Sequence, residues 1–98
     1  MSCSVTSVFT FKIESNFDEW AAIFDSEEAN QRHSKFDIKP LYRGISIDDP
    51  QKVIVIHQAP KGSIQRFIEA NGKWMATHRI DLSTMEESSW TTSLKKYS

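Results

Sequence analysis

The best candidate site in the sequence is a group of polar side chains near the end of a helical segment. Trp74 and His78 follow Asn71 by three and seven positions, and this spacing places all three residues on one side of a helix. An imidazole beside an indole and an amide can bind a small molecule or act as a base. The alternative interpretation is that Trp74 packs in the core and His78 caps the helix end.

His57 is the second candidate because it continues one face of a strand. It follows Val53 and Val55 at two-residue spacing, so its imidazole is expected on their face, where it can act as a general base toward a bound carbon acid. The position also suits a hydrogen-bonded core or rim histidine without a chemical role. His33, with Asp37 four residues later, is a weaker pair. The histidines lack the cysteine and carboxylate spacing of a metal site, so we expect no metal.

Arg43 and three aromatic residues complete the candidate ligand contacts. Arg43 precedes Gly44 in a strand, and its guanidinium can hold a carboxylate or phosphate, or else it is a solubilising charge on an edge strand. Phe9, Phe11 and Trp90 can line an aromatic cavity or belong to an ordinary aromatic core. The sequence holds no phosphate loop, nucleophile elbow or HExxH motif.

Composition limits the class of protein that carries these residues. The 98 residues predict a single domain, 1–98, and 39% hydrophobic with 26% charged residues is typical of a soluble globular chain. A formal net charge of -1 argues against a nucleic-acid partner. The one cysteine, Cys3, has no partner for a disulfide, and no signal or membrane-spanning segment is evident. We therefore expect a cytoplasmic protein.

The first half of the chain predicts a strand followed by a helical region. Residues 5–13 alternate between apolar and polar types, as in a strand. Asn16 and Glu19 have the spacing of a capping box, and an apolar stripe follows at Phe17, Trp20, Ala21 and Phe24. The stripe slips at Ser26, which predicts a kink or a fresh short helix carrying Ala29, His33 and Phe36.

The second half predicts three more strands and one more helix. Residues 41–47 and 53–59 form strands around the turn at 48–51, and both faces of the second of these strands are apolar. A helix capped by Ser63 runs to Thr77 or His78. Residues 88–94 are β-prone and form the last strand.

This order of elements predicts an α+β, ferredoxin-like βαββαβ fold. Its four-stranded antiparallel sheet carries two helices on one face. Because both faces of the strand at 53–59 are apolar and the helices cover only one face of the sheet, we expect a second copy to pack on the open face, sheet to sheet, as a homodimer. An RNA partner would need exposed stacking aromatics on residues 53–56, and the sequence has none there.

The chain resembles a family of small uncharacterised cyanobacterial proteins over nearly its whole length. The resemblance is carried by NFDEW at 16–20, DSEEA at 25–29, PLYRG at 40–44, DDPQKVIVIHQA at 48–59, TH at 77–78 and DLSTM at 81–85. It implies a place in the dimeric α/β-barrel superfamily, in which two ferredoxin-like units share a barrel and small molecules bind between sheet and helices. That superfamily includes monooxygenases acting on polyketides, isomerases and haem-degrading enzymes.

The resemblance leaves several functions open. Our first hypothesis is a homodimeric protein that binds a small organic molecule without turnover, through His57, Asn71, Trp74 and His78. The second is a cofactor-independent monooxygenase or isomerase of an aromatic or polyketide-like substrate, with His57 or His78 as the base. The third is a purely structural dimer. Haem binding is disfavoured: His78 sits where similar haem-degrading enzymes have their axial ligand, but the first strand has no asparagine, and Ala70 stands about where those enzymes have a tryptophan. We expect no cofactor and no membrane partner.

Overall fold

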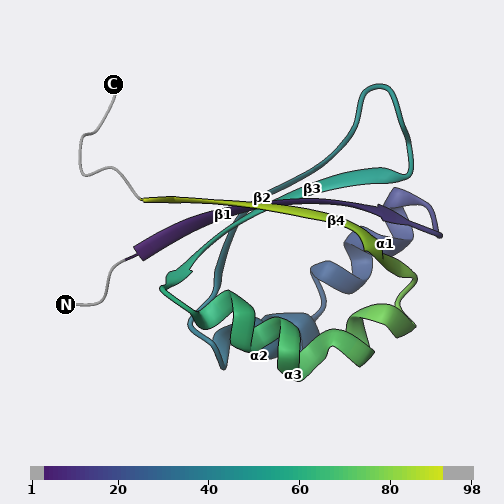
Figure 1. Cartoon of the computed structure of the whole chain (residues 1–98). Helices are drawn as coiled ribbons and strands as arrows, with labels where there is room; N and C mark the ends of the chain where they lie inside the picture. The colour runs from purple at the N-terminus through teal and green to yellow at the C-terminus, as the bar shows by residue number, and fades with distance from the viewer. Residues whose placement is uncertain (1–3, 92–98) are drawn as a thin grey trace.

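The computed structural model describes residues 4–91 as one four-stranded antiparallel sheet with all helices on one face (Figure 1). The strands are β1 (Ser4–Ile13), β2 (Lys39–Ile45), β3 (Lys52–Pro60) and β4 (Ile80–Thr91), and the helices are α1 (Phe17–Phe24), α2 (Glu27–Ser34) and α3 (Ser63–Thr77). The spatial order of the strands is β2-β3-β1-β4. The element order and this sheet make the ferredoxin-like fold, as the sequence predicts.

The first crossover is divided into two short helices, each with its own cap. The Asn16 side chain accepts a hydrogen bond from the Glu19 amide at 2.8 Å, and Ser26 Oγ accepts one from the Ala29 amide at 3.2 Å. The chain between the caps turns, so the two apolar stripes face the sheet independently. Of the two readings of Ser26, the fresh short helix is the correct one.

The start of α3 differs from the prediction. Gly62 is the N-cap, with φ 86° and no side-chain hydrogen bond at the cap. Only glycine adopts this left-handed conformation without strain, which turns the chain from β3 into the helix. Ser63 is the first helical residue and is buried, and its Oγ accepts a hydrogen bond from Arg66 at 3.1 Å. The prediction that Ser63 caps the helix is therefore wrong.

Two strand boundaries also differ from those the sequence predicts. β2 starts at Lys39 and ends at Ile45, so both of its ends lie two residues earlier than those of the predicted 41–47 strand. The strand can include Pro40 because β2 is an edge strand, where the missing N–H of proline breaks no hydrogen bond of the sheet. β4 starts at Ile80 rather than 88, since pairing with β1 overrides the weak β propensity of residues 81–87. Residues 92–94 and Cys3 lie outside the described residues.

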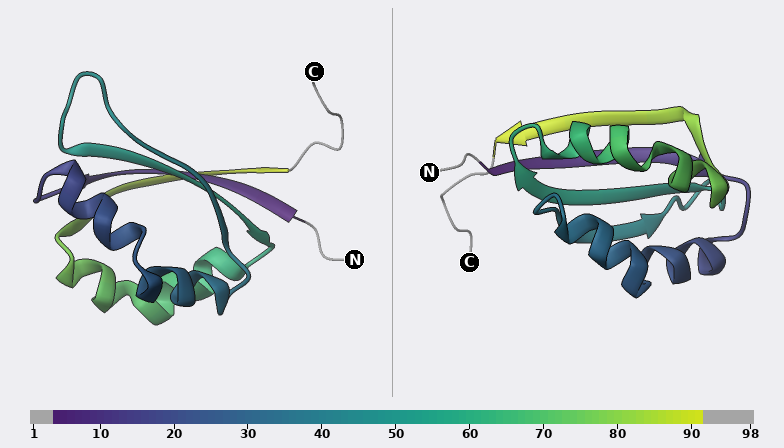
Figure 2. Two further views of the ribbon diagram at one scale, coloured as in Figure 1. Left: turned by 180° about the vertical axis from the view of Figure 1, so that it is seen from behind. Right: turned by 90° about the horizontal axis from the view of Figure 1, so that it is seen from below.

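The core lies between the sheet and the helices. Figure 2 shows α3 beneath the β1–β4 side of the sheet and α1 and α2 beneath the β2–β3 side. Alternate residues of β1 and β3 face these helices and are buried, among them Phe9, Phe11, Val53 and Val55. In the described chain, no helix is long and apolar enough to cross a membrane.

Candidate functional site

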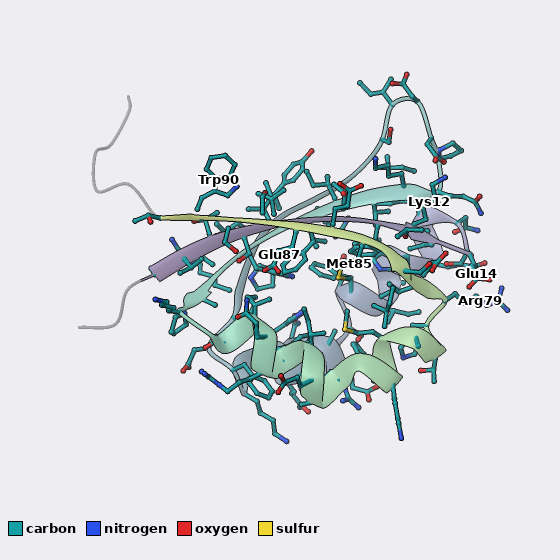
Figure 3. The ribbon with its side chains drawn as sticks, viewed as in Figure 1. Lys12, Glu14, Arg79, Met85, Glu87 and Trp90 are labelled. Carbon is teal, nitrogen blue, oxygen red and sulfur yellow. The ribbon has the colours of Figure 1, made fainter. Side chains whose placement is uncertain are left out.

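A cavity of about 70 Å³ lies between the helices and the covered face of the sheet. Every strand and helix except β2 contributes to its wall, which is apolar apart from the rings of His33, His57, Trp74 and His78. Phe9 and Phe11 line it, as the sequence predicts for an aromatic cavity, whereas Trp90 does not. Figure 3 shows the reason: Met85 and Trp90 both belong to β4, but Met85 points toward the helices and Trp90 away from them.

His57 enters the cavity from β3. Its side of the strand faces the helices, and the residue is 7% exposed. The ring packs among aromatic neighbours, with centroid distances of 6.0 Å to Phe9, 5.9 Å to Phe24 and 5.2 Å to His33. Its Nδ1 is buried without a hydrogen-bond partner. Burial, reinforced by His33, lowers the pKa of His57 to about 3, so the imidazole is neutral at physiological pH.

His33 also lies in the cavity wall, although the sequence predicts for it only a weak pair with Asp37. It is 5% exposed on α2 and stacks on Phe67, with centroids 5.0 Å apart and an interplanar angle of 17°. Its Nδ1 is also buried and unpartnered, and burial lowers its pKa. The pairing with Asp37 is absent, because Asp37 follows the helix at φ 56° and is exposed. A usable signal was in the sequence: Ala29, His33 and Phe36 have helical spacing, which puts His33 on the inner face.

His78 lines the same cavity from its far end. It is the C-cap of α3, and its ring meets Trp74 edge-on at 4.9 Å. On β1, Ser7 pairs with His57 and Ile13 pairs with Ile80, two residues after His78. Six residues of strand span about 20 Å. His57 and His78 are therefore not a catalytic pair on one reacting atom, and the imidazole beside His57 is that of His33.

Asn71 is engaged with protein partners at both ends of its amide. Nδ2 donates to the Phe67 carbonyl at 3.0 Å, and Oδ1 accepts from Arg32 at 2.6 Å. The same guanidinium donates to Glu28 at 3.0 Å and lies 4.6 Å from the centre of the Trp74 ring. Asn71 is buried but is not in the cavity wall. Together these contacts join α2 to α3 on the outer side of Trp74.

Arg43 lies away from the cavity. It donates to Asp25 from Nε at 3.0 Å and from Nη2 in a second, bidentate contact, and it lies 5.8 Å from the Phe17 ring. Asp25 follows α1 directly, so the pair ties the end of this helix to β2. The structure thus gives Arg43 an intramolecular carboxylate partner instead of a position at the ligand cavity.

Sequence comparison gives the family. A model described as a domain of unknown function, DUF3764, matches residues 3–92. The chain belongs to this family. A comparison with curated proteins gives no match.

Solved structures similar to the DUF3764 chain share its fold. A monooxygenase from the gene ActVA-Orf6 of Streptomyces coelicolor, in complex with nanaomycin D, has a TM-score of 0.66 at 8% identity, covering 98% of this chain and 93% of that chain. SnoaB, a cofactor-independent oxygenase from Streptomyces nogalater, has a TM-score of 0.58 at 16% identity, covering 96% and 97%. A dimeric ferredoxin-like protein from an uncultured marine organism has a TM-score of 0.57 at 11% identity, covering 100% and 94%. Identities this low establish the fold and no shared activity.

The chemistry open to the DUF3764 cavity is set by its volume and its neutral imidazoles. An apolar cavity of about 150 Å³ accommodates benzene, so a cavity of about 70 Å³ does not accommodate a haem macrocycle. A general base works best with a pKa near the working pH, and the lowered pKa of His57 makes it a weak base. A neutral imidazole does offer one hydrogen-bond donor and one acceptor. The site is therefore better suited to binding than to proton abstraction.

Proposed function

We propose that this DUF3764 protein is a homodimer that binds a small organic molecule in the cavity between its sheet and its helices. The observation that carries the proposal is the pair of buried imidazole nitrogens, His33 Nδ1 and His57 Nδ1, without a hydrogen-bond partner. An unmade buried hydrogen bond costs about 1–3 kcal/mol, and native proteins rarely leave one unmade. A ligand with polar atoms beside His33 and His57 and apolar atoms along the rest of the wall would match both the polar and the apolar part of the cavity.

The open face of the sheet supports the homodimer. The strand registers place Tyr42, Ile54, Ile56, Val8 and Trp90 on this face, opposite the helices. Tyr42 and Trp90 are 57% and 60% exposed. A cluster of large apolar side chains on one face is typical of a protein interface. A similar solved structure carries the description of a dimeric ferredoxin-like protein, and we propose a cytoplasmic homodimer of this kind, with cyanobacterial relatives as the sequence resemblance implies.

Native mass spectrometry tests the ligand and the dimer together. The protein is purified gently from its own host and its native mass is compared with its denatured mass. We expect a dimer carrying a reproducible small additional mass. The variant Ala29→Leu fills the cavity wall, because Ala29 is buried in it, and it removes the additional mass. Ala76→Leu, the same change at an exposed position of α3, retains it. An empty protein, or a mass that Ala29→Leu also retains, contradicts ligand binding in this cavity.

Sedimentation velocity at micromolar concentration tests the interface separately. Ile56→Lys places a charge in the middle of the open face, and we expect it to give monomers. Thr77→Lys adds the same charge at an exposed helix position and should leave the dimer intact. A stable wild-type monomer would remove this part of the proposal.

A second candidate function is a cofactor-independent monooxygenase or isomerase of an aromatic or polyketide-like substrate. It is favoured by the imidazoles in the cavity wall and by the shared fold with SnoaB and the ActVA-Orf6 monooxygenase. In this proposal His57 or His78 is the base, and binding of an anionic intermediate raises the pKa of the neighbouring imidazole. His57→Ala or His78→Ala then abolishes turnover while the circular dichroism spectrum and the dimer stay unchanged. Full turnover of an identified substrate by both variants excludes this function.

A further inference from the structure

We propose that the ligand is an uncharged, planar molecule whose buried end carries a neutral hydrogen-bonding group, such as an amide or a ketone, against His33 and His57. The inference rests on the proposed function and narrows its ligand class. It follows from two features of the described cavity wall: no acidic or basic side chain other than histidine lines it, and the imidazoles of His33 and His57 do.

The cavity offers no ionic partner at its histidine pair. Of the residues that the structure describes, no aspartate, glutamate, lysine or arginine lines the wall. Arg32 is not in the wall: it lies over the Trp74 ring, and its terminal nitrogens donate to Asn71 and Glu28. The third imidazole, His78, packs on Trp74 toward the other end of the cavity. An ion buried without a partner is strongly disfavoured, so this end of the cavity selects against both carboxylates and ammonium groups.

The two imidazoles together form a hydrogen-bonding pair for a neutral group. Burial lowers the pKa of both His33 and His57, and a neutral imidazole presents one donor and one acceptor. Their centroids are 5.2 Å apart. One ligand group that both donates and accepts, as an amide does, can satisfy a nitrogen on each ring.

The surrounding rings favour a flat ligand. Phe67 lies at 17° to the plane of His33, and Phe24 lies at 24° to the plane of His57. Aromatic rings prefer offset-stacked partners, so a planar ligand fits this array better than a branched aliphatic one. The cavity of about 70 Å³ is smaller than an apolar cavity of about 150 Å³ that binds benzene. Met75 and Met85 line the wall, and their flexible side chains can move to admit a ring.

Three probes of nearly equal shape test the charge preference. Benzamide, benzoate and benzamidinium share one planar ring and carry charges of zero, minus one and plus one at pH 7. Each is titrated against the wild-type protein by ligand-detected NMR. We expect benzamide to bind about tenfold or more tightly than either ion, because neither ion finds a counter-charge. Ala29→Leu should abolish the benzamide signal, and Ala76→Leu should retain it.

The outcomes separate this inference from the proposed function. Binding of benzoate or benzamidinium as tightly as benzamide overturns the ligand class and leaves ligand binding standing. Absence of binding by all three probes overturns both. The hydrogen-bonding role of the two imidazoles has its own test, in which ethylbenzene serves as an apolar probe. His33→Phe should reduce the ratio of the affinity for benzamide to that for ethylbenzene. His57→Leu serves where that variant fails to fold, and an unchanged preference in a folded variant overturns the role of the pair.

Discussion

The two faces of β3 carry similar apolar residues but have different surroundings. Val53 and Val55 face the helices and are buried, whereas Ile54 and Ile56 lie on the open face and are only partly buried. The protein's own helices cover the first face, and the packing there leaves a cavity lined by two imidazoles whose Nδ1 atoms have no hydrogen-bond partner. The second face has no cover within the described chain. In our proposal, this one apolar strand serves a ligand site on one side and a partner chain on the other.

The largest expected effect is on stability, and it contrasts an aromatic residue of the covered core with one of the open face. Phe67→Ala removes a side chain that is 7% exposed and stacked on His33, and it should lower the free energy of unfolding by about 3–5 kcal/mol. Trp90→Ala removes a larger side chain that is 60% exposed, and it should cost about 1 kcal/mol or less in the monomer. Urea denaturation at a concentration that populates monomers measures both. Equal losses would contradict the assignment of covered and open faces.

Between pH 7 and pH 4, acid should act mainly on the covered face. The pKa of His57 falls from 6.5 in the unfolded chain to about 3 in the fold, chiefly through burial, and that of His33 is also lowered. The unfolded state therefore binds more protons below pH 6.5, and stability falls as the pH drops from 6.5 toward 3. For His57 the slope between these two pKa values is about 1.4 kcal/mol per pH unit, and His33 adds to it in the same direction.

Denaturant titrations between pH 7 and pH 4 measure that slope. His57→Leu should reduce it, and a variant of an open-face residue, Tyr42→Phe, should leave it as in the wild type. A slope that His57→Leu does not change would show that other groups control the acid sensitivity.

If the open face is a dimer interface, the thermal stability of the protein should depend on its concentration. A dimer is stabilised by mass action, so the wild-type Tm should rise by several degrees between about 1 and 100 µM protein. Ile56→Lys should remove most of this dependence while leaving the Tm at the lowest concentration within a few degrees of the wild type. A wild-type Tm independent of concentration would argue that the open face is not a dimer interface.

Two glycine substitutions provide the smallest and sharpest contrast. A Cβ on Gly44 would lie 2.8 Å from Tyr42 Oη, whereas a Cβ on Gly72 meets nothing within 4 Å. In the monomer, Gly44→Ala should displace the exposed Tyr42 ring and cost less than about 1 kcal/mol, because that ring can rotate into solvent. Gly72→Ala lies within α3 and should stabilise the protein by about 0.5–1 kcal/mol. Thermal denaturation and the Tyr42 NMR signals distinguish the two, and effects of the same sign would contradict the packing at Gly44.

Local signals predicted most of the fold and part of the cavity. The caps at Asn16 and Ser26 and the alternation of β1 and β3 depend on neighbours a few positions away, so the sequence alone reveals them. The start of β4 was missed because its polar residues form a strand only by pairing with β1. Phe9, Phe11, His57, Trp74 and His78 were anticipated as cavity candidates, and all line the cavity. Whether they act on a ligand stays a prediction.

The sequence by itself determined the order of the elements, their inner faces and the apolar character of both sides of β3, because periodicity and capping are properties of short segments. Only the tertiary structure decided which polar groups meet. His33 and His57 are 24 positions apart and on different elements, and they meet because α2 packs beneath β3. Arg32 and Asp25 likewise engage Asn71 and Arg43 across elements. Such contacts depend on how separate elements dock, and no local pattern in the chain encodes them.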